Sequence, residues 1–189
     1  MRTKIMDGAR MLFREKGYSN VTMRAIGRRV GCSAAAIYRH FRNKREIMDA
    51  LRHEGFERLV EIVQFEMVST DPVQRLVEFG RGYVRFALAH PDAFALMYDL
   101  AGQGPEELMD YESEPMEGYA FFTNLVQEAV QSGKLGDVDQ ETLRFSLWST
   151  VHGLSCLVNS GRLKIVHGSV DELELLDRML RWVVHSDRS

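Results

Sequence analysis

The sequence predicts an all-α protein, and three observations carry this prediction. Only four prolines occur in 189 residues, and proline is the residue that disrupts helices most strongly. Apolar residues recur at three- and four-residue intervals, which is the period of an amphipathic helix. No alternating run of apolar and polar residues is long enough to indicate a sheet. Because 45% of the residues are apolar, the chain can also bury a core, which argues against intrinsic disorder.

Three short helices are predicted first. The first covers about residues 3–16, and Gly17 is expected to end it in the left-handed conformation. Thr22 begins the second helix, Gly31 interrupts the pattern, and Ser33 caps the third. The residues expected to face inward are Ile5, Ala9, Leu12, Phe13, Ala25, Ile26, Val30, Ile37 and Phe41.

A long helix follows over about residues 44–67, because Asn43 and Glu46 have the spacing of a capping box. Asp71-Pro72 signals the start of the next helix, which ends at His90. Further helices are predicted at about 92–100, 116–132, 140–159 and 171–185. Residues 101–115 have the composition of the least ordered segment, with room for one short helix, and residues 161–169 are expected to form a connector. The inward residues of the long helix include Ile47, Leu51, Leu59 and Ile62.

Charge is divided unevenly along the chain. Residues 1–55 contain 13 Lys and Arg against 5 Asp and Glu, a net charge of +8. The rest of the chain contains 11 basic and 22 acidic residues, a net charge of −11. We therefore expect a polyanionic partner for the N-terminal part alone, since the remainder would repel phosphate.

The second and third predicted helices have the features of a helix-turn-helix. Gly27 leaves room for two helices to cross closely, and Gly31 supplies the turn. Ile26, Val30 and Ile37 would form the apolar wedge between the helices. A buried helix pair of another kind could share these features, but it would not be followed by so many solvated cations. The basic and aromatic residues that follow the helix pair are Tyr38, Arg39, His40, Lys44 and Arg45.

Residues 9–51 resemble the DNA-binding domain of the TetR family of bacterial transcriptional regulators. The resemblance rests on the elements GY-x-x-VTMR and IYRHF-x-NK, and one departure is Gly27, where the family more often has alanine. It implies a helix-turn-helix DNA-binding domain over residues 1–48 and a helical ligand-binding and dimerisation domain over residues 49–189. The implied DNA-binding residues are Thr22, Arg24, Arg28, Ser33, Ala34, Ala35, Ala36, Tyr38, Arg39, His40 and Lys44.

Three of these residues are alanines, which limits how the DNA sequence is read. An alanine methyl can touch the methyl group of thymine but cannot hydrogen-bond a base edge. Directional contacts must then come from Ser33, Arg28, Arg39 or the N-terminal Arg2 and Lys4. We expect phosphate contacts to supply most of the affinity, with a steep dependence on salt.

The C-terminal part is predicted to sense a small molecule. The helix over residues 72–90 has two apolar faces, which indicates that other helices cover it on both sides. One face is aromatic, and we expect it to line a ligand cavity, although ordinary core packing is the simpler interpretation. The residues assigned to ligand binding are Phe79, Tyr83, Phe86, Met97, Tyr98, Trp148 and His152. Arg81, Arg85 and His152 are candidates for binding an anionic group.

The helix over residues 140–159 carries small residues along one side, where another helix can approach closely. It also contains Trp148, His152 and Gly153, which resemble the Trp-His-Gly motif of one class of TetR-family C-terminal domain. In that family, the last two long helices before the C-terminal one form a four-helix bundle between two subunits, which implies a homodimer. The residues assigned to dimerisation are Ser146, Ser149, Gly153, Leu154 and Leu157.

The sequence thus predicts a ligand-responsive transcriptional regulator, most often a repressor in this family. It would bind a near-palindromic double-stranded operator as a homodimer and be released by a small-molecule effector. Two alternatives remain: an architectural helix-turn-helix protein without effector, and an enzyme with a DNA-binding domain, for which no catalytic motif is present. We expect a cytoplasmic protein without membrane contact, cofactor or metal site. Cys32 and Cys156 are expected to be reduced core residues, and the acidic residues Glu106, Glu107, Asp110, Glu112 and Glu114 a solvated loop.

Overall fold

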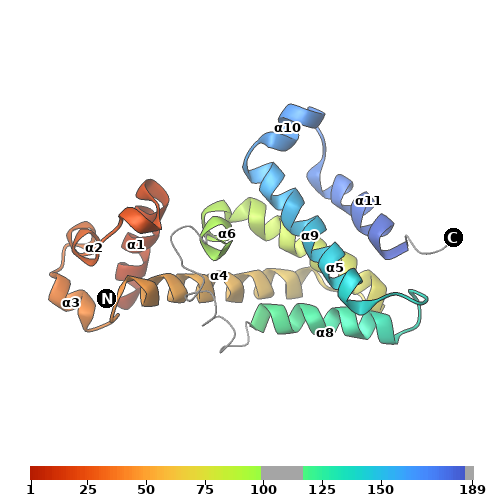
Figure 1. Cartoon of the computed structure of the whole chain (residues 1–189), viewed down its shortest axis with the longest axis horizontal. Coiled ribbons are helices and arrows are strands. Elements are labelled where there is room, and N and C mark those ends of the chain that lie inside the picture. Colours follow the sequence, from red (N-terminus) through yellow and green to blue (C-terminus); the bar gives the residue numbers. More distant parts are fainter. Residues whose placement is uncertain (99–116, 186–189) are drawn as a thin grey trace. The chain divides into compact units, whose positions relative to one another are not determined.

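The computed structural model describes residues 1–98 and 117–185, and every regular element in these ranges is a helix (Figure 1). The all-α class is therefore confirmed. The chain divides into two compact units, with Met1–Gly55 and the segment from Asp92 in unit 1, and Phe56–Pro91 and the segment from Pro115 in unit 2. None of the described helices is both long and apolar enough to cross a membrane.

Unit 1 contains α1 (Arg2–Lys16), the 3-10 helix η1 (Tyr18–Asn20), α2 (Met23–Val30), α3 (Ala34–Tyr38), the first part of α4 (Lys44–Glu66) and α6 (Pro91–Tyr98). Eight of the nine residues expected to face inward in the first three helices are buried, and Ala25 packs at the edge of the same core. Ile47, Met48 and Leu51 of α4 complete this core together with Leu96 of α6.

Local hydrogen bonds set the helix boundaries in unit 1. The Thr22 hydroxyl accepts from the Ala25 N–H at 3.2 Å, and the Ser33 hydroxyl accepts from the Ala36 N–H at 3.2 Å. Gly31 is left-handed, with φ 71° and ψ 36°, so these three predictions are confirmed. Gly17 ends α1 as predicted, but it is not in the left-handed helical conformation, because its φ of 74° is combined with an extended ψ of 152°. The chain extends at Gly17 and continues directly into η1.

The start of α4 differs in one bond from the predicted capping box. The Asn43 side chain accepts from the Glu46 N–H at 2.9 Å, as expected. The Glu46 carboxylate, however, accepts from the Arg42 N–H at 2.6 Å rather than from Asn43. This backbone hydrogen bond from Arg42 is the main reason why the pKa of Glu46 is lowered.

The helix α6 is docked on the rest of unit 1 by polar and apolar contacts. Leu96 is buried in the unit 1 core, and the Arg52 Nε, itself on a buried side chain, donates to the Leu96 carbonyl at 3.3 Å. Arg14 of α1 forms an ion pair with Asp92 at 2.7 Å. Gly55 of α4 leaves room for Met97, whose Cγ would lie 2.7 Å from an added Cβ. α6 therefore belongs to the same packed unit as α1 and the beginning of α4.

Unit 2 contains the remainder of α4, α5 (Pro72–Ala89), α8 (Glu117–Gln131), α9 (Gln140–Asn159), α10 (Arg162–His167) and α11 (Glu172–His185). α5 packs against α8, α9 and α11 (Figure 1). Two glycines allow this packing. A Cβ on Gly82 would lie 2.8 Å from the Val63 Cα of α4, and one on Gly80 would lie 2.5 Å from the Leu180 Cδ1 of α11. The prediction that α5 is covered on both sides is confirmed.

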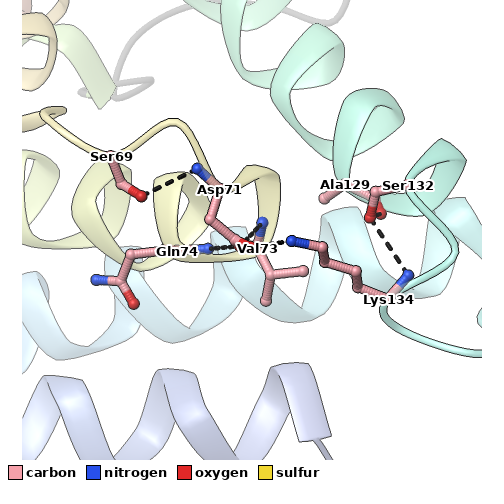
Figure 2. Close-up of polar contacts among 7 residues, drawn as sticks. All are labelled: Ser69, Asp71, Val73, Gln74, Ala129, Ser132 and Lys134. Carbon is pink, nitrogen blue, oxygen red and sulfur yellow. Dashed lines mark hydrogen bonds and ion pairs between the residues drawn. The ribbon is translucent and has the colours of Figure 1, made fainter.

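Asp71 fixes the start of α5, as predicted. Its Oδ1 accepts from the Val73 and Gln74 N–H groups, both at 3.0 Å, and its other oxygen forms an ion pair with Lys134 in the connection between α8 and α9 (Figure 2). The hydrogen bond from Lys134 is the main reason why the pKa of the Asp71 carboxyl is lowered. The ion pair links the beginning of α5 to the end of the α8 segment.

The sequence predictions for residues 161–169 and for the two cysteines are wrong in part. Residues 161–169 are not a plain connector, because α10 forms within them after a left-handed Gly161 and is anchored by the buried Leu163. Cys156 is not a core residue but lies exposed on α9, and Cys32 is only half-buried; both thiols are free.

We predict that Gly82→Ala destabilises the protein. The added methyl would clash with the α4 backbone, which cannot move as a side chain end can, so the helices must separate. We expect a net loss of about 1–2 kcal/mol in the free energy of unfolding after the gain in helix propensity. Urea denaturation measures it. Gly118→Ala is the control, because its Cβ would make an ordinary 3.5 Å contact with Phe56; equal effects of the two variants would contradict the account.

Candidate nucleic-acid interface and effector region

The helices α2 and α3 cross closely because Gly27 has no side chain. A Cβ on Gly27 would lie 2.8 Å from the Cys32 carbonyl oxygen and 3.4 Å from the Ile37 Cδ1. The Cys32 N–H donates to the Gly27 carbonyl at 2.9 Å and closes the turn. Ile26, Val30 and Ile37 are buried between the helices. The predicted helix-turn-helix geometry is therefore present, and it fixes α3 on α2.

The outer side of α3 is small at its start and aromatic at its end. Ala35 is exposed, Ala34 and Ala36 are half-buried, and the Tyr38 side chain is 55% exposed. Ser33 is exposed, but its oxygen already accepts the capping hydrogen bond from Ala36. Its O–H remains able to donate. The first turn of α3 thus presents methyl groups and one hydroxyl rather than a set of directional hydrogen-bonding groups.

All five acidic residues of the first 55 form ion pairs with arginines. Asp7 and Glu54 pair with Arg10, Glu15 pairs with Arg29, Glu46 with Arg42, and Asp49 with Arg45. In contrast, Arg24, Arg28 and Arg39 are exposed and form no ion pair with any described residue. Three arginines that no carboxylate neutralises therefore lie on α2 and at the end of α3, while Lys4 and Lys16 of α1 are further exposed cations of the unit.

Two further cations lie beside aromatic rings of unit 1. The Lys44 ammonium, at the first residue of α4, donates to the Tyr18 carbonyl at 2.7 Å and lies 4.1 Å from the centre of the Tyr18 ring. Burial lowers the pKa of Lys44. The Arg2 guanidinium lies 5.0 Å from the centre of the Phe41 ring. The sequence pattern assigned Lys44 but missed Tyr18, for which only its place in the GY element was a signal.

Four of the seven residues predicted to bind a ligand lie together in unit 2. The Tyr83 hydroxyl is 3.0 Å from the His152 Nδ1. The ring centre of Trp148 lies 6.1 Å from that of His152, and the ring centre of Phe79 lies 6.2 Å from that of Tyr83. Phe122 of α8 stacks on Phe79 with ring centres 4.7 Å apart. Phe121 and Phe122 were not among the residues predicted to bind a ligand. The available signal was their position on the apolar side of α8, which indicates core packing. The cluster joins α5, α8 and α9.

The other three residues lie elsewhere. Phe86 is fully buried in unit 2, with its ring 5.5 Å from that of His90. Met97 and Tyr98 belong to unit 1, where Met97 lies against Gly55 and the Tyr98 ring lies 5.1 Å from Phe94. The sequence pattern could not assign these residues to a unit, because α6 follows α5 directly along the chain.

The groups considered for binding an anion are largely neutralised. Arg81 forms an ion pair with Asp177, and its Nε donates to that carboxylate at 2.6 Å. Arg85 pairs with Glu66 at 2.8 Å. Burial lowers the pKa of His152, which favours the neutral imidazole. The acidic residues between Glu106 and Glu114 lie outside the described residues, and the described part contains no group of three or more His, Cys, Asp and Glu suited to a metal ion.

The residues predicted for dimerisation differ in their exposure. Ser149 and Leu157 are exposed, whereas Ser146 and Gly153 are half-buried. A Cβ on Gly153 would meet no atom of the described residues within 4 Å, so none of these neighbours requires a glycine there. Leu154 lies instead in the core of unit 2, where it is 2% exposed. A second subunit could therefore not reach the Leu154 side chain.

Two family models match the chain. The model of the bacterial regulatory proteins of the tetR family matches residues 5–51, and that of the tetracyclin repressor-like C-terminal domain matches residues 76–183. The second match alone covers more than half of the chain.

The chain belongs to the TetR family. It is 29% identical over 167 residues to the HTH-type transcriptional repressor Rv1474c of Mycobacterium tuberculosis, a match that covers 85% of this chain and 83% of the relative. It is 40% identical over 62 residues to the HTH-type transcriptional repressor AcnR of Corynebacterium diphtheriae, over 33% of each chain. Both relatives are named as repressors rather than as enzymes.

The fold is shared with solved structures. The transcriptional regulator FadR of Bacillus subtilis in complex with stearoyl-CoA matches with a TM-score of 0.79 and 18% identity, over 97% of this chain and 98% of that one. The fatty acid degradation regulator FadR of Bacillus halodurans matches with a TM-score of 0.75 and 19% identity, over 99% and 96%. At these identities, the similarity concerns the fold.

Arg28 and Arg29 provide a matched test of the interface, because they are neighbours on α2 and only Arg29 is paired with a carboxylate. We predict that Arg28→Ala weakens DNA binding and reduces the slope of log affinity against log salt by about 0.9 for each DNA-bound copy, as expected for one lost phosphate contact. Arg29→Ala should change neither quantity appreciably. Fluorescence anisotropy with a labelled duplex measures both. A larger effect of Arg29→Ala would contradict the assignment.

Proposed function

We propose that this TetR-family protein is a ligand-responsive transcriptional repressor that binds a near-palindromic operator as a homodimer. The observation that carries the proposal is the set of arginines on α2 and α3 that no carboxylate neutralises, on a helix-turn-helix with an exposed alanine side. Such a surface matches a phosphate backbone with a groove between its strands. The names of the relatives support the repressor assignment.

In this proposal, DNA binding divides into anchoring and reading. Arg24, Arg28 and Lys44 bind phosphates, together with Thr22, Tyr38 and His40 at the ends of α2 and α3. The outer methyl groups of Ala34, Ala35 and Ala36 fit closely against the major groove, where they can touch thymine methyl groups. Arg39 and the Ser33 O–H provide the directional contacts. The affinity should then depend strongly on salt, and the sequence preference should rest on close fit.

The proposed subunit interface is the outer side of α9, together with α8. No Asp, Glu, Lys or Arg occurs between Phe145 and Ser160, whereas 27% of the whole chain is charged. Phe145 and Leu157 are 48% and 43% exposed there. An uncharged apolar helix side is typical of a homodimer interface. Ser149 and Gly153 would allow the partner helix to approach closely, while Leu154 is left out of the proposed contact.

We propose that α4 and α6 transmit the effector signal. α4 continues from unit 1 into unit 2, and α5 leads directly into α6, whose residues from Asp92 are packed on unit 1 by Leu96, Arg52 and Arg14. A movement of α5 would thus act on the DNA-binding unit through a docked helix and not only through α4. We propose a DNA-binding domain over residues 1–48 and a ligand-binding and dimerisation domain over residues 49–189. In this division, α6 belongs to the second domain by sequence but packs on the N-terminal unit. A coupling of about 1–3 kcal/mol is sufficient for regulation.

For the effector, we propose an at least partly apolar molecule that binds near Phe79, Tyr83, Trp148 and His152. The aromatic cluster supports an apolar ligand, and the stearoyl-CoA bound by the Bacillus subtilis FadR is one such molecule. Neutral His152 and the Tyr83 hydroxyl would provide polar contacts, whereas Arg81 and Arg85 are already paired. Because Trp148, His152 and Gly153 resemble the Trp-His-Gly motif, we propose that the C-terminal domain belongs to that class. We also propose a cytoplasmic location.

Selection from a random duplex library tests the proposed function without a known operator. We expect the protein to enrich a near-palindromic sequence with half-sites about one DNA turn apart, roughly 34–36 Å. Addition of long-chain acyl compounds or other apolar molecules in a mobility-shift assay should then release the enriched duplex. Enrichment of a single half-site would contradict dimeric binding. Strong binding that no effector class alters would favour the architectural alternative.

We predict that Gly153→Leu disrupts the homodimer but leaves the protomer folded. The new Cβ meets no described atom within 4 Å, so the added side chain has room to start outward, where it would obstruct a helix from a second copy. Sedimentation velocity should show dimers dissociating at concentrations where the unmodified protein stays dimeric. Glu174→Leu, which adds the same side chain to an exposed position of α11, is the control and should leave the assembly unchanged. An unchanged dimer in Gly153→Leu would exclude this side of α9 from the interface.

A further inference from the structure

Lys44 is held in place inside unit 1 before any DNA is bound. Its ammonium group donates to the Tyr18 carbonyl at 2.7 Å and lies over the Tyr18 ring, 4.1 Å from its centre. The Tyr18 ring is in turn fixed against Phe13, with ring centres 5.4 Å apart and a tilt of 54°. Phe13 is 3% exposed and belongs to the unit 1 core. The lysine is therefore connected to the core through one aromatic side chain.

This connection matters because a lysine ammonium is a point charge at the end of a flexible four-carbon side chain. A free lysine loses much rotamer entropy when it contacts a phosphate. Lys44 has already lost part of that freedom, because one of its three donors is used by the Tyr18 carbonyl. Burial lowers the pKa of this group, while the carbonyl dipole and the face of the Tyr18 ring both stabilise its positive charge. Its remaining donors are free to point away from Tyr18.

We propose that Tyr18 is a positioning residue for DNA binding: its ring and carbonyl fix the Lys44 ammonium at the start of α4, so that it meets a phosphate with little further ordering. The inference rests on the proposed phosphate contact of Lys44. It assigns Tyr18 a role that its half-buried position at the edge of the core does not by itself require. The backbone carbonyl is present in any variant, so side-chain substitutions test the ring.

Affinity for a mixed-sequence duplex of about three helical turns, measured over a range of KCl concentrations, tests this role, since phosphate contacts do not depend on sequence. Lys44→Met should reduce the salt slope by about 0.9 for each DNA-bound copy. Tyr18→Leu should lower the affinity about three- to tenfold with little change in slope, because the charge stays but is less ordered. Tyr18→Phe keeps the ring and should bind as the unmodified protein does. In a Lys44→Met background, Tyr18→Leu should have no further effect.

A purely structural role of Tyr18 gives a different result. Tyr18→Leu would then weaken binding by the same factor with or without Lys44, and such additivity overturns the inference while leaving the phosphate contact of Lys44 intact. An unchanged salt slope in Lys44→Met would instead refute the phosphate contact, and with it the role of Tyr18. If Tyr18→Leu does not fold, side-chain NMR of the unmodified protein decides. The Lys44 ε-methylene should be clearly more ordered than that of the exposed Lys16, and equal mobility would contradict the inference.

Discussion

The close crossing of α2 and α3 is the constraint on which the proposed DNA interface depends. It exists because Gly27 places backbone against backbone, with the Cys32 carbonyl where a Cβ would otherwise lie, 2.8 Å away. Ile26 and Ile37 are fully buried on either side of this contact. Once the crossing is set, the Ser33 cap fixes the first turn of α3, and the alanine side faces outward. The exposed groups are thus positioned by contacts that lie beneath them.

Charge in unit 1 is arranged around this crossing. The five carboxylates of the first 55 residues lie where they pair with arginines of α1, α2, α4 and the turn before α4, and the α2–α3 surface keeps Arg24, Arg28 and Arg39 unpaired. Each surface pair contributes little to stability. Its effect on the field is larger, because each pair neutralises one arginine, whereas Arg24, Arg28 and Arg39 keep their full positive charge beside the α2–α3 crossing. The net charge of the segment alone does not reveal this pattern.

Features determined by neighbouring residues could be predicted from the sequence. Thr22, Ser33 and Asp71 cap their helices as expected, because a capping bond joins residues two or three positions apart. The exposed side of α2 and α3 could be predicted from the spacing of their apolar residues, which are buried on the opposite side.

Features that depend on tertiary packing could not be predicted. Arg81 pairs with Asp177, which is 96 residues away in the sequence, so its loss as an anion-binding candidate was not visible in any local pattern. The docking of α6 on unit 1, the burial of Leu154 and the exposure of Cys156 have the same origin. Each depends on which side of a helix another helix covers, and apolar periodicity shows that a side is covered without showing by what.

We propose that DNA binds to the arginines of α2 and α3 that no carboxylate neutralises. Mass-spectrometric footprinting with phenylglyoxal, which modifies accessible guanidinium groups, tests it most directly. The account predicts that Arg24, Arg28 and Arg39 react in the free protein and are protected by a bound duplex. The reaction of Arg29 and Arg10, held by Glu15 and Glu54, should not depend on DNA. Protection of the paired arginines, with Arg24, Arg28 and Arg39 still reactive, would contradict the claim.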